Sequence, residues 1–149
     1  MADAGDPRLM EAVRSALDFA QLDDETLGRL VTSSSLRRLP AGEVLFEKGS
    51  DPDGLYVVVS GTLSIFQVLH GEEHSIALIG PGDFTGEVSL ALRTTRTRSA
   101  RAREDAEVLV IPVAAFEELA AANPHLGAQL VAAFEERVAQ REEAAAESD

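Results

Sequence analysis

The residues best suited to chemistry lie in one stretch, GPGDFTGEVSLALRTTRTRSARA, between Gly80 and Ala102. This stretch separates two predicted strands and joins a glycine-rich turn, a short helix-like piece over 88–92 and a run of arginines. Gly86 opens the helix-like piece, where backbone N–H groups are left without helical partners, and such groups favour a phosphate. Glu87 beside it is an acceptor suited to a sugar hydroxyl. These residue types indicate a site for a phosphate attached to a ribose.

Five of the 13 basic residues lie within the eleven positions 93–103, at the end of this stretch, with no acid among them: Arg93, Arg96, Arg98, Arg101 and Arg103. An arginine arriving from the next strand adds a charge-assisted, bidentate contact to phosphate oxygens. The whole chain has a net charge of -13, which disfavours nucleic acid and anionic membranes as partners. An acidic chain with one basic island suits a small phosphate ligand, although a solvated basic strand facing acidic neighbours would show the same run.

The spacing of apolar residues predicts helices at both ends of the chain and strands between them, and these elements position the stretch. Apolar residues recur at spacings of three and four over 8–19, and the acids at 23–25 open a second helix. From Ser35 to Pro112, short runs rich in Val, Ile and Leu are broken by glycines, as in antiparallel strands joined by tight turns. The helical pattern returns from Val113, and Pro124 separates two helices. The fold class is therefore mainly β with flanking helices: N-terminal helices, a small antiparallel β-barrel and two C-terminal helices.

The same stretch resembles the phosphate-binding cassette of the cyclic nucleotide-binding domain family, which includes protein kinase A regulatory subunits and the bacterial catabolite activator protein. The bacterial cassette, G-D-F-x-G-E-L-x-L, stands here as Gly82-Asp83-Phe84-Thr85-Gly86-Glu87-Val88-Ser89-Leu90. Similarity extends to Leu39–Phe46 and Leu55–Gly61, and it covers the chain from Phe19 to Phe134. The resemblance implies a double-stranded β-helix, or jelly roll.

The resemblance also implies a division of the chain. We expect an N-terminal helix over 1–18, a cyclic nucleotide-binding domain over 19–136 and an acidic, alanine-rich tail over 137–149.

The resemblance further implies which residues bind the ligand. Backbone N–H groups around Gly86, Val88 and Ser89 would hold the phosphate, and Glu87 would accept the ribose 2′-hydroxyl. We predict that Arg96 pairs with the phosphate, because the kinase-type cassette then aligns without a gap. Arg98 is the other candidate, since it copies the bacterial Arg-Ser-Ala with a shifted spacing. As alternate residues of one predicted strand, Arg96 and Arg98 would point to the same side, toward the pocket. The predicted ligand-binding set is Phe84, Gly86, Glu87, Val88, Ser89, Arg96, Thr97 and Arg98.

Some positions depart from the family's pattern. No proline precedes either arginine, Ser89 replaces the usual alanine, and Arg98 stands where the kinase-type motif has a small residue. Thr97, directly after Arg96, resembles members that prefer cGMP, whereas members that prefer cAMP usually have alanine there. The departures leave open a degenerate cassette that binds no nucleotide.

Catalytic and metal signatures are missing from the sequence. There is no cysteine, no Gly-x-Ser-x-Gly, no His-Glu-x-x-His and no Walker-type lysine loop. His70 and His74 flank a predicted hairpin turn, which favours solvated side chains over metal ligands. We therefore predict no catalytic residues, no metal, no cofactor and no enzymatic activity; a metal-dependent cupin barrel is the most distant alternative.

The predicted function is a non-enzymatic regulatory or receptor module that binds cAMP or cGMP and signals through its C-terminal helix. For the helix over 124–141 two alternatives stay open: its apolar stripe packs on the barrel, or it exposes Phe134 or Val138 as a lid over the base or as the seam of a homodimer or a protein partner. Two alternatives remain: a degenerate domain that serves as a protein-interaction module, and a cyclic dinucleotide receptor in which Arg98 binds the second phosphate.

The location is predicted from the ends and the apolar runs. The start of the chain is acidic without an apolar segment, and the apolar runs are too short to cross a bilayer. We expect a cytoplasmic protein of bacterial type that binds neither DNA nor membranes.

Overall fold

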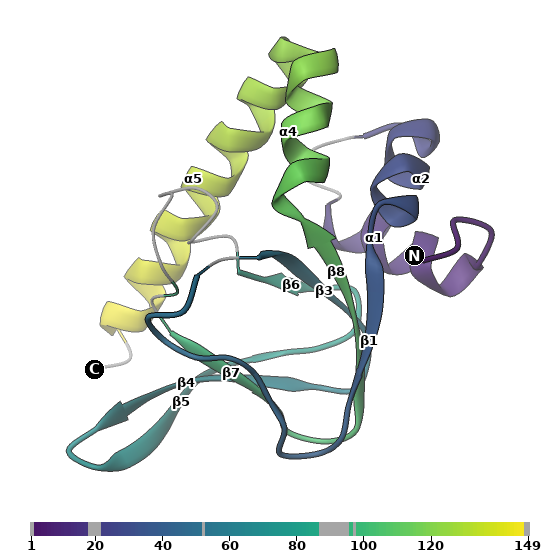
Figure 1. The fold of residues 1–149 in the computed structure, drawn as a ribbon. Helices are drawn as coiled ribbons and strands as arrows, with labels where there is room; N and C mark the ends of the chain where they lie inside the picture. The colour runs from purple at the N-terminus through teal and green to yellow at the C-terminus, as the bar shows by residue number, and fades with distance from the viewer. Residues whose placement is uncertain (1, 18–21, 52, 87–95, 97, 148–149) are drawn as a thin grey trace.

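Two antiparallel sheets and four helices make up the computed structural model, which describes residues 2–17, 22–51, 53–86, 96 and 98–147 (Figure 1). The first sheet has the strand order β1-β8-β3-β6: Ser35–Leu39, Ala106–Pro112, Gly54–Ser60 and Phe84–Thr85. The second has the order β2-β7-β4-β5: Val44–Phe46, Ser99–Ala102, Leu63–Leu69 and Glu72–Ile79. The mainly β jelly-roll class is confirmed, with the described strands in two sheets.

The helices flank the first sheet. They are α1 (Pro7–Ala16), α2 (Asp24–Thr32), α4 (Val113–Ala122) and α5 (Pro124–Glu147). Figure 1 shows α4 leaving the end of β8 and α5 running back beside it. The helix α5 continues beyond Arg141, so the backbone of the predicted acidic tail is helical as far as Glu147. Among the described residues, no helix is both long enough and apolar enough to cross a membrane.

The core has two parts, which lie on opposite faces of the first sheet. One part fills the space between the helices and this sheet, and it includes Val13, Leu30, Leu55, Val57, Phe84, Leu109 and Phe134. The other lies between the two sheets, and it includes Leu39, Tyr56, Val58, Leu63, Ile65, Ala100 and Val108. Because successive side chains of a strand point to opposite faces, β3 supplies both parts in alternation.

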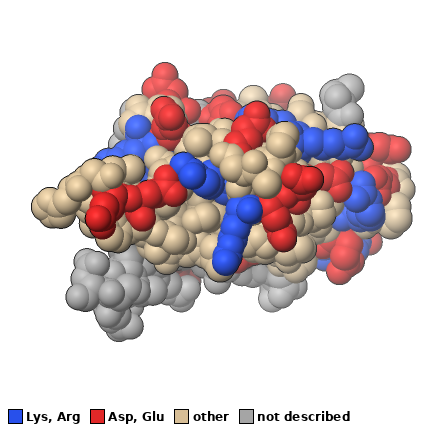
Figure 2. Space-filling view, turned by 90° about the horizontal axis from the view of Figure 1, so that it is seen from below, with Lys and Arg blue, Asp and Glu red and all other residues tan. Residues whose placement is uncertain are grey.

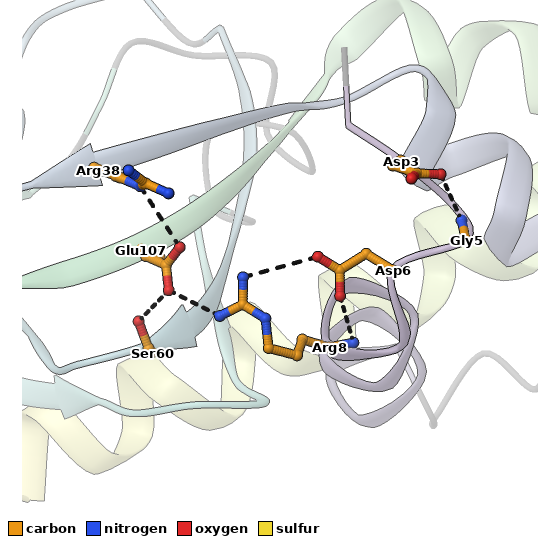
Figure 3. A network of polar contacts seen from close by, with 7 residues as sticks. All are labelled: Asp3, Gly5, Asp6, Arg8, Arg38, Ser60 and Glu107. Carbon is orange, nitrogen blue, oxygen red and sulfur yellow. Dashed lines mark hydrogen bonds and ion pairs between the residues drawn. The ribbon is translucent and has the colours of Figure 1, made fainter.

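A carboxylate on β8 ties α1 to the sheet (Figure 3). Arg8 donates to Glu107 Oε1 at 3.0 Å, Ser60 Oγ donates to the same oxygen at 3.0 Å, and Arg38 Nε lies 3.8 Å from Oε2. The hydrogen bonds from Arg8 and Ser60 hold the pKa of the Glu107 carboxyl below its ordinary value. Asp6 caps α1 by accepting from the Arg8 backbone N–H at 2.9 Å, so the start of the helix is fixed beside this network.

Two turn glycines with similar backbone angles make a matched test of packing. Gly61 has φ +80°, and a Cβ there would collide with the backbone of Asp105 and Ala106. Gly71 has φ +78°, but a Cβ there would meet no described atom within 4 Å. We expect Gly71→Ala to lower the free energy of unfolding by about 1 kcal/mol from backbone strain alone. Gly61→Ala should cost clearly more in urea unfolding, and equal losses would contradict the predicted collision.

Candidate ligand-binding site

Arg96 is the buried cation at the centre of the candidate site. Only 2% of its side chain is exposed. Its backbone is held by the loop between β2 and β3, since Arg96 N donates to Ser50 O at 2.9 Å and Gly49 N donates to Arg96 O at 2.7 Å. The position of this arginine is therefore set by a segment more than forty residues earlier in the chain.

Three acceptors surround the guanidinium. Arg96 Nη1 donates to Gly86 O at 3.1 Å, while Nη2 donates to Gly54 O at 2.9 Å and to Asp53 Oδ1 at 3.0 Å. Arg96 Nε is buried and has no hydrogen-bond partner among the described residues. A buried charge is stable only when its polar groups are paired, so an open Nε–H is a costly feature unless another acceptor uses it.

Two aromatic rings lie against the same guanidinium. Phe46 of β2 and Tyr56 of β3 stack with ring centroids 5.4 Å apart. Arg96 Cζ lies 4.5 Å from the centroid of Phe46 and 5.1 Å from that of Tyr56, which is the range of a cation–π contact. The Tyr56 hydroxyl donates to Asp53 Oδ1, the oxygen that also accepts from Arg96. The ring pair and the carboxylate thus form one cage around the cation.

Gly86 must be a glycine in this conformation. Its φ is +95°, and a Cβ there would lie 2.7 Å from Arg96 Nη1 and 3.1 Å from Gly54 O. Either the arginine or the β3 backbone would have to move to admit a side chain. The glycine that the sequence places before Glu87 therefore allows the turn to approach the arginine directly.

The sequence model of the family described as "Cyclic nucleotide-binding domain" matches residues 36–123, which include every residue of this cage. The chain belongs to the cyclic nucleotide-binding domain family.

Curated relatives are longer proteins. An uncharacterized NTE family protein of Mycobacterium tuberculosis is 32% identical over 123 residues, which cover 83% of this chain and 21% of the relative. The cyclic AMP receptor protein of Thermus thermophilus is 42% identical over 84 residues, which cover 55% of this chain and 39% of the relative. The chain therefore spans well under half of the length of these relatives.

Solved structures of the family share the fold. The regulatory domain of Toxoplasma gondii PKA with cAMP matches with a TM-score of 0.70 and 25% identity, over 74% of this chain and 42% of that one. The N-terminal domain of a transcriptional regulator from Streptomyces coelicolor matches with a TM-score of 0.74 and 29% identity, over 87% and 93% of the two chains.

The structure brings together part of the predicted ligand-binding set. Gly86 and Arg96 are in direct contact, because Arg96 Nη1 donates to Gly86 O. Glu87, Val88, Ser89 and Thr97, and the helix-like piece over 88–92, lie outside the described residues. Whether these residues bind a ligand stays a prediction.

The predicted strand placement of the two arginines is wrong. Arg96 and Arg98 were expected at alternate positions of one strand, facing the same side, but β7 begins only at Ser99. Arg98 lies at a bend and is partly buried, whereas Arg96 is buried in its cage. Neither arginine belongs to β7, so the period-two alternation of that strand does not extend to them.

The sequence analysis did not predict three residues of the cage, namely Phe46, Asp53 and Tyr56. They approach Arg96 only because β2 and β3 lie beside the segment after β6. In the sequence they look like ordinary strand and turn residues, since the Asp53-Gly54 pair is typical of a turn. No local signal connects them to an arginine some forty residues later.

Phe84 and Phe134 connect the site to the C-terminal helix. Phe84 lies two residues before Gly86, is fully buried and meets Phe134 of α5 edge to face at a centroid distance of 6.0 Å. Phe116 of α4 contacts Phe134 in the same way at 6.0 Å. The alternative in which Phe134 is exposed is therefore wrong: it is 5% exposed, because α5 packs its apolar stripe against α4 and β6. The side chain of Val138 is outside the part of the chain that the structure describes, so its exposure stays a prediction.

Tyr56 provides a spectroscopic probe of the cage. Burial, and then the hydrogen bond to Asp53, raise the pKa of Tyr56 to about 12. Because the chain has one tyrosine and no tryptophan, tyrosinate absorbance reports on this residue alone. In the folded protein the absorbance change expected of a free tyrosine near pH 10 should be missing, and it should return in urea.

The same shift predicts a pH dependence of stability. The folded state holds the Tyr56 proton more tightly than the unfolded state, so this contribution is complete below about pH 10 and is lost as the pH rises toward 12. Asp53→Asn should lower the pKa of Tyr56 only in part, because burial is the larger cause. Ionisation of the folded protein near pH 10 would show that Tyr56 is not buried in this way.

Proposed function

We propose that the chain is a non-enzymatic receptor domain that binds a cyclic nucleoside monophosphate, cAMP or cGMP, through Arg96 and the turn at Gly86. The observation that carries this proposal is the buried guanidinium of Arg96, which contacts that turn and whose Nε–H has no partner in the part of the chain that the structure describes. Membership of the cyclic nucleotide-binding domain family supports the ligand class.

One edge of the guanidinium suits a phosphate. Nε and Nη2 lie on the same edge of the planar group, the edge that carboxylates and phosphates bind with two parallel hydrogen bonds. Asp53 uses only Nη2, and 58% of its side chain is exposed, so its carboxylate can turn toward water; the phosphate oxygen that replaces it would also have to accept from the Tyr56 hydroxyl. A cyclic phosphate has two free oxygens and one negative charge, which would replace Asp53 at Nη2 and also satisfy Nε. Gly54 and Gly86 would keep the arginine in place through their carbonyls.

The rest of the ligand would follow the family's cassette. Backbone N–H groups at Gly86, Val88 and Ser89 would hold the phosphate, and Glu87 would accept the ribose 2′-hydroxyl. Two relatives named above are described with cAMP, a cyclic AMP receptor protein and a PKA regulatory domain, which supports cAMP. Thr97 after the phosphate arginine favours cGMP. Both nucleotides are therefore candidates.

Ligand binding would be transmitted to the rest of the protein by a change in the position of α5. Phe84 and Gly86 belong to one short segment, so a ligand that moves the turn also moves the ring that packs against Phe134. A ligand that prefers one arrangement of this contact shifts the population of α5. In a longer protein, as in the relatives, a fused domain attached after α5 would respond to that shift; a homodimer or a separate protein partner would respond to it in the same way.

A ligand-free interaction module is the second candidate. Both terminal nitrogens of Arg96 already donate to acceptors of the chain itself, so the arginine has a structural role without any nucleotide. This reading predicts that no cyclic nucleotide stabilises the protein.

A thermal-shift titration tests the ligand and the arginine together. At a hundred times its dissociation constant, cAMP or cGMP should stabilise the wild type by roughly 2.7 kcal/mol, a rise of about 5–10 °C for a domain of this size. Arg96→Ala and Arg96→Lys should both abolish the rise, since lysine keeps the charge but loses the two-donor edge. Arg103→Ala is the matched control, because Arg103 belongs to the same arginine cluster but is exposed.

Other outcomes separate the alternatives. No rise with millimolar cAMP, cGMP or cyclic di-GMP would favour the interaction module. A rise that survives Arg96→Ala and disappears in Arg98→Ala would move the phosphate contact to Arg98. A rise with cyclic di-GMP alone would indicate a dinucleotide receptor. The lysine variant matters because the alanine variant leaves a hole in a buried site.

Hydrogen exchange tests the proposed route to α5. In the wild type, ligand should slow amide exchange in the first half of α5, and Phe134→Leu should reduce this effect while ligand still binds. Leucine keeps the burial of Phe134 but removes the ring that contacts Phe84. Val131→Ala is the control on the same helix, since Val131 is 49% exposed. An unchanged ligand effect in Phe134→Leu would rule out this contact as the route.

A further inference from the structure

The two aromatic rings beside Arg96 contact the guanidinium without using any of its N–H donors, which the polar contacts cannot do. The three acceptors contact the edges of the guanidinium, where each one occupies N–H donors. The rings of Phe46 and Tyr56 contact its face, and a cation–π contact uses no donor. A ring can therefore hold the cation in place and leave its Nε–Nη2 edge available to a ligand.

We propose that Phe46 is a positioning residue for phosphate binding: its ring fixes the plane of the Arg96 guanidinium before the ligand arrives. This inference rests on the proposed function. A free arginine side chain loses rotamer entropy when it is ordered, so an arginine ordered in advance binds its anion more tightly.

Phe46 is better suited to this role than the other members of the cage. Its ring is the nearer of the two, at 4.5 Å against 5.1 Å for Tyr56. It has no polar atom that competes for Arg96, whereas Asp53 occupies Nη2 and must give way to a phosphate. It is only partly buried at the border of the core between the sheets, so its ring is less committed to core packing than that of Tyr56.

The position of Phe46 follows from the sheet. It pairs with Ala100 of β7, and the register shifts between Val44 and Phe46 on the short strand β2. A register shift of this kind re-aims a side chain.

The outer face of the same sheet provides a matched control. Phe66 of β4 has an arginine over its ring as well, with Arg101 Cζ at 4.7 Å from the centroid. Arg101 pairs with Glu73 at 2.6 Å, and it alternates along β7 with Ala100 and Ala102, which face the core between the sheets. The Phe66–Arg101 contact is therefore similar in chemistry but lies on the other side of the sheet from Arg96.

Calorimetric titration with cAMP and cGMP tests the proposal. Phe46→Leu should weaken binding about 3- to 30-fold, the range expected for loss of one cation–π contact. Phe46→Tyr, which keeps the ring, should bind within about twofold of the wild type, and so should Phe66→Leu. Urea unfolding of the two leucine variants shows whether their losses of stability are comparable.

A second measurement reports on Arg96 without any ligand. In nitrogen-15 NMR, the side-chain Nε–H of Arg96 should exchange faster with solvent in Phe46→Leu than in the wild type, and Phe46→Tyr should restore the slow exchange. If the wild type binds cAMP or cGMP and Phe46→Leu binds equally well, the positioning role is overturned while the proposed function stands. If the wild type binds neither nucleotide, the proposed function itself fails, and the positioning role is rejected with it.

Discussion

The burial of one positive charge is the constraint on which this site depends. A guanidinium removed from water needs acceptors for its N–H groups and either a negative charge or an aromatic face for its charge. Arg96 obtains these from three separate segments: Phe46 on β2, the start of β3 at 53–56, and the turn at Gly86. Since β2 and β3 belong to different sheets, the arginine also links the two sheets. Moving any of these segments would remove one of the partners of the buried charge.

A ligand would replace one of the groups around Arg96 and would leave the others in contact with the guanidinium. Asp53 neutralises the guanidinium through Nη2, one of the two nitrogens that a phosphate would use, and it is largely exposed. The carbonyls of Gly54 and Gly86 and the two rings hold the arginine without bringing a second negative charge. An anion can therefore exchange with the carboxylate while the cation stays where it is. On the face shown in Figure 2 acidic and basic side chains are interspersed. The guanidinium of Arg96 is itself buried, with 2% of the side chain exposed.

Strand alternation connects this site to helices on the other side of the sheet. Tyr56 faces the arginine, while its neighbours Leu55 and Val57 face α1, α2 and α5. In the same way, Phe84 packs against Phe134, and two residues later Gly86 touches Arg96. A short segment thus contacts both the cation and the C-terminal helix. The N-terminal helix is part of the same body, because Arg8 binds Glu107 on β8 and Val13 packs in the core below the helices (Figure 3).

The strands, the helix starts and the cassette residues could be predicted from the amino-acid sequence, because each depends on residues close together in the chain. Hydrophobic period and glycine turns predicted strands between flanking helices, Asp23 to Glu25 predicted the start of α2, and the cassette residues placed Arg96 near Gly86. The groups that surround Arg96 could be identified only in the folded structure. Asp53 lies 43 positions away in the sequence, and nothing in the sequence around Phe46 or Tyr56 predicts a contact with an arginine. The tertiary structure also decided that Phe134 is buried and that β7 begins after Arg98. A local pattern reports which face of an element is apolar, but it does not report which distant strand or helix comes to lie against that face.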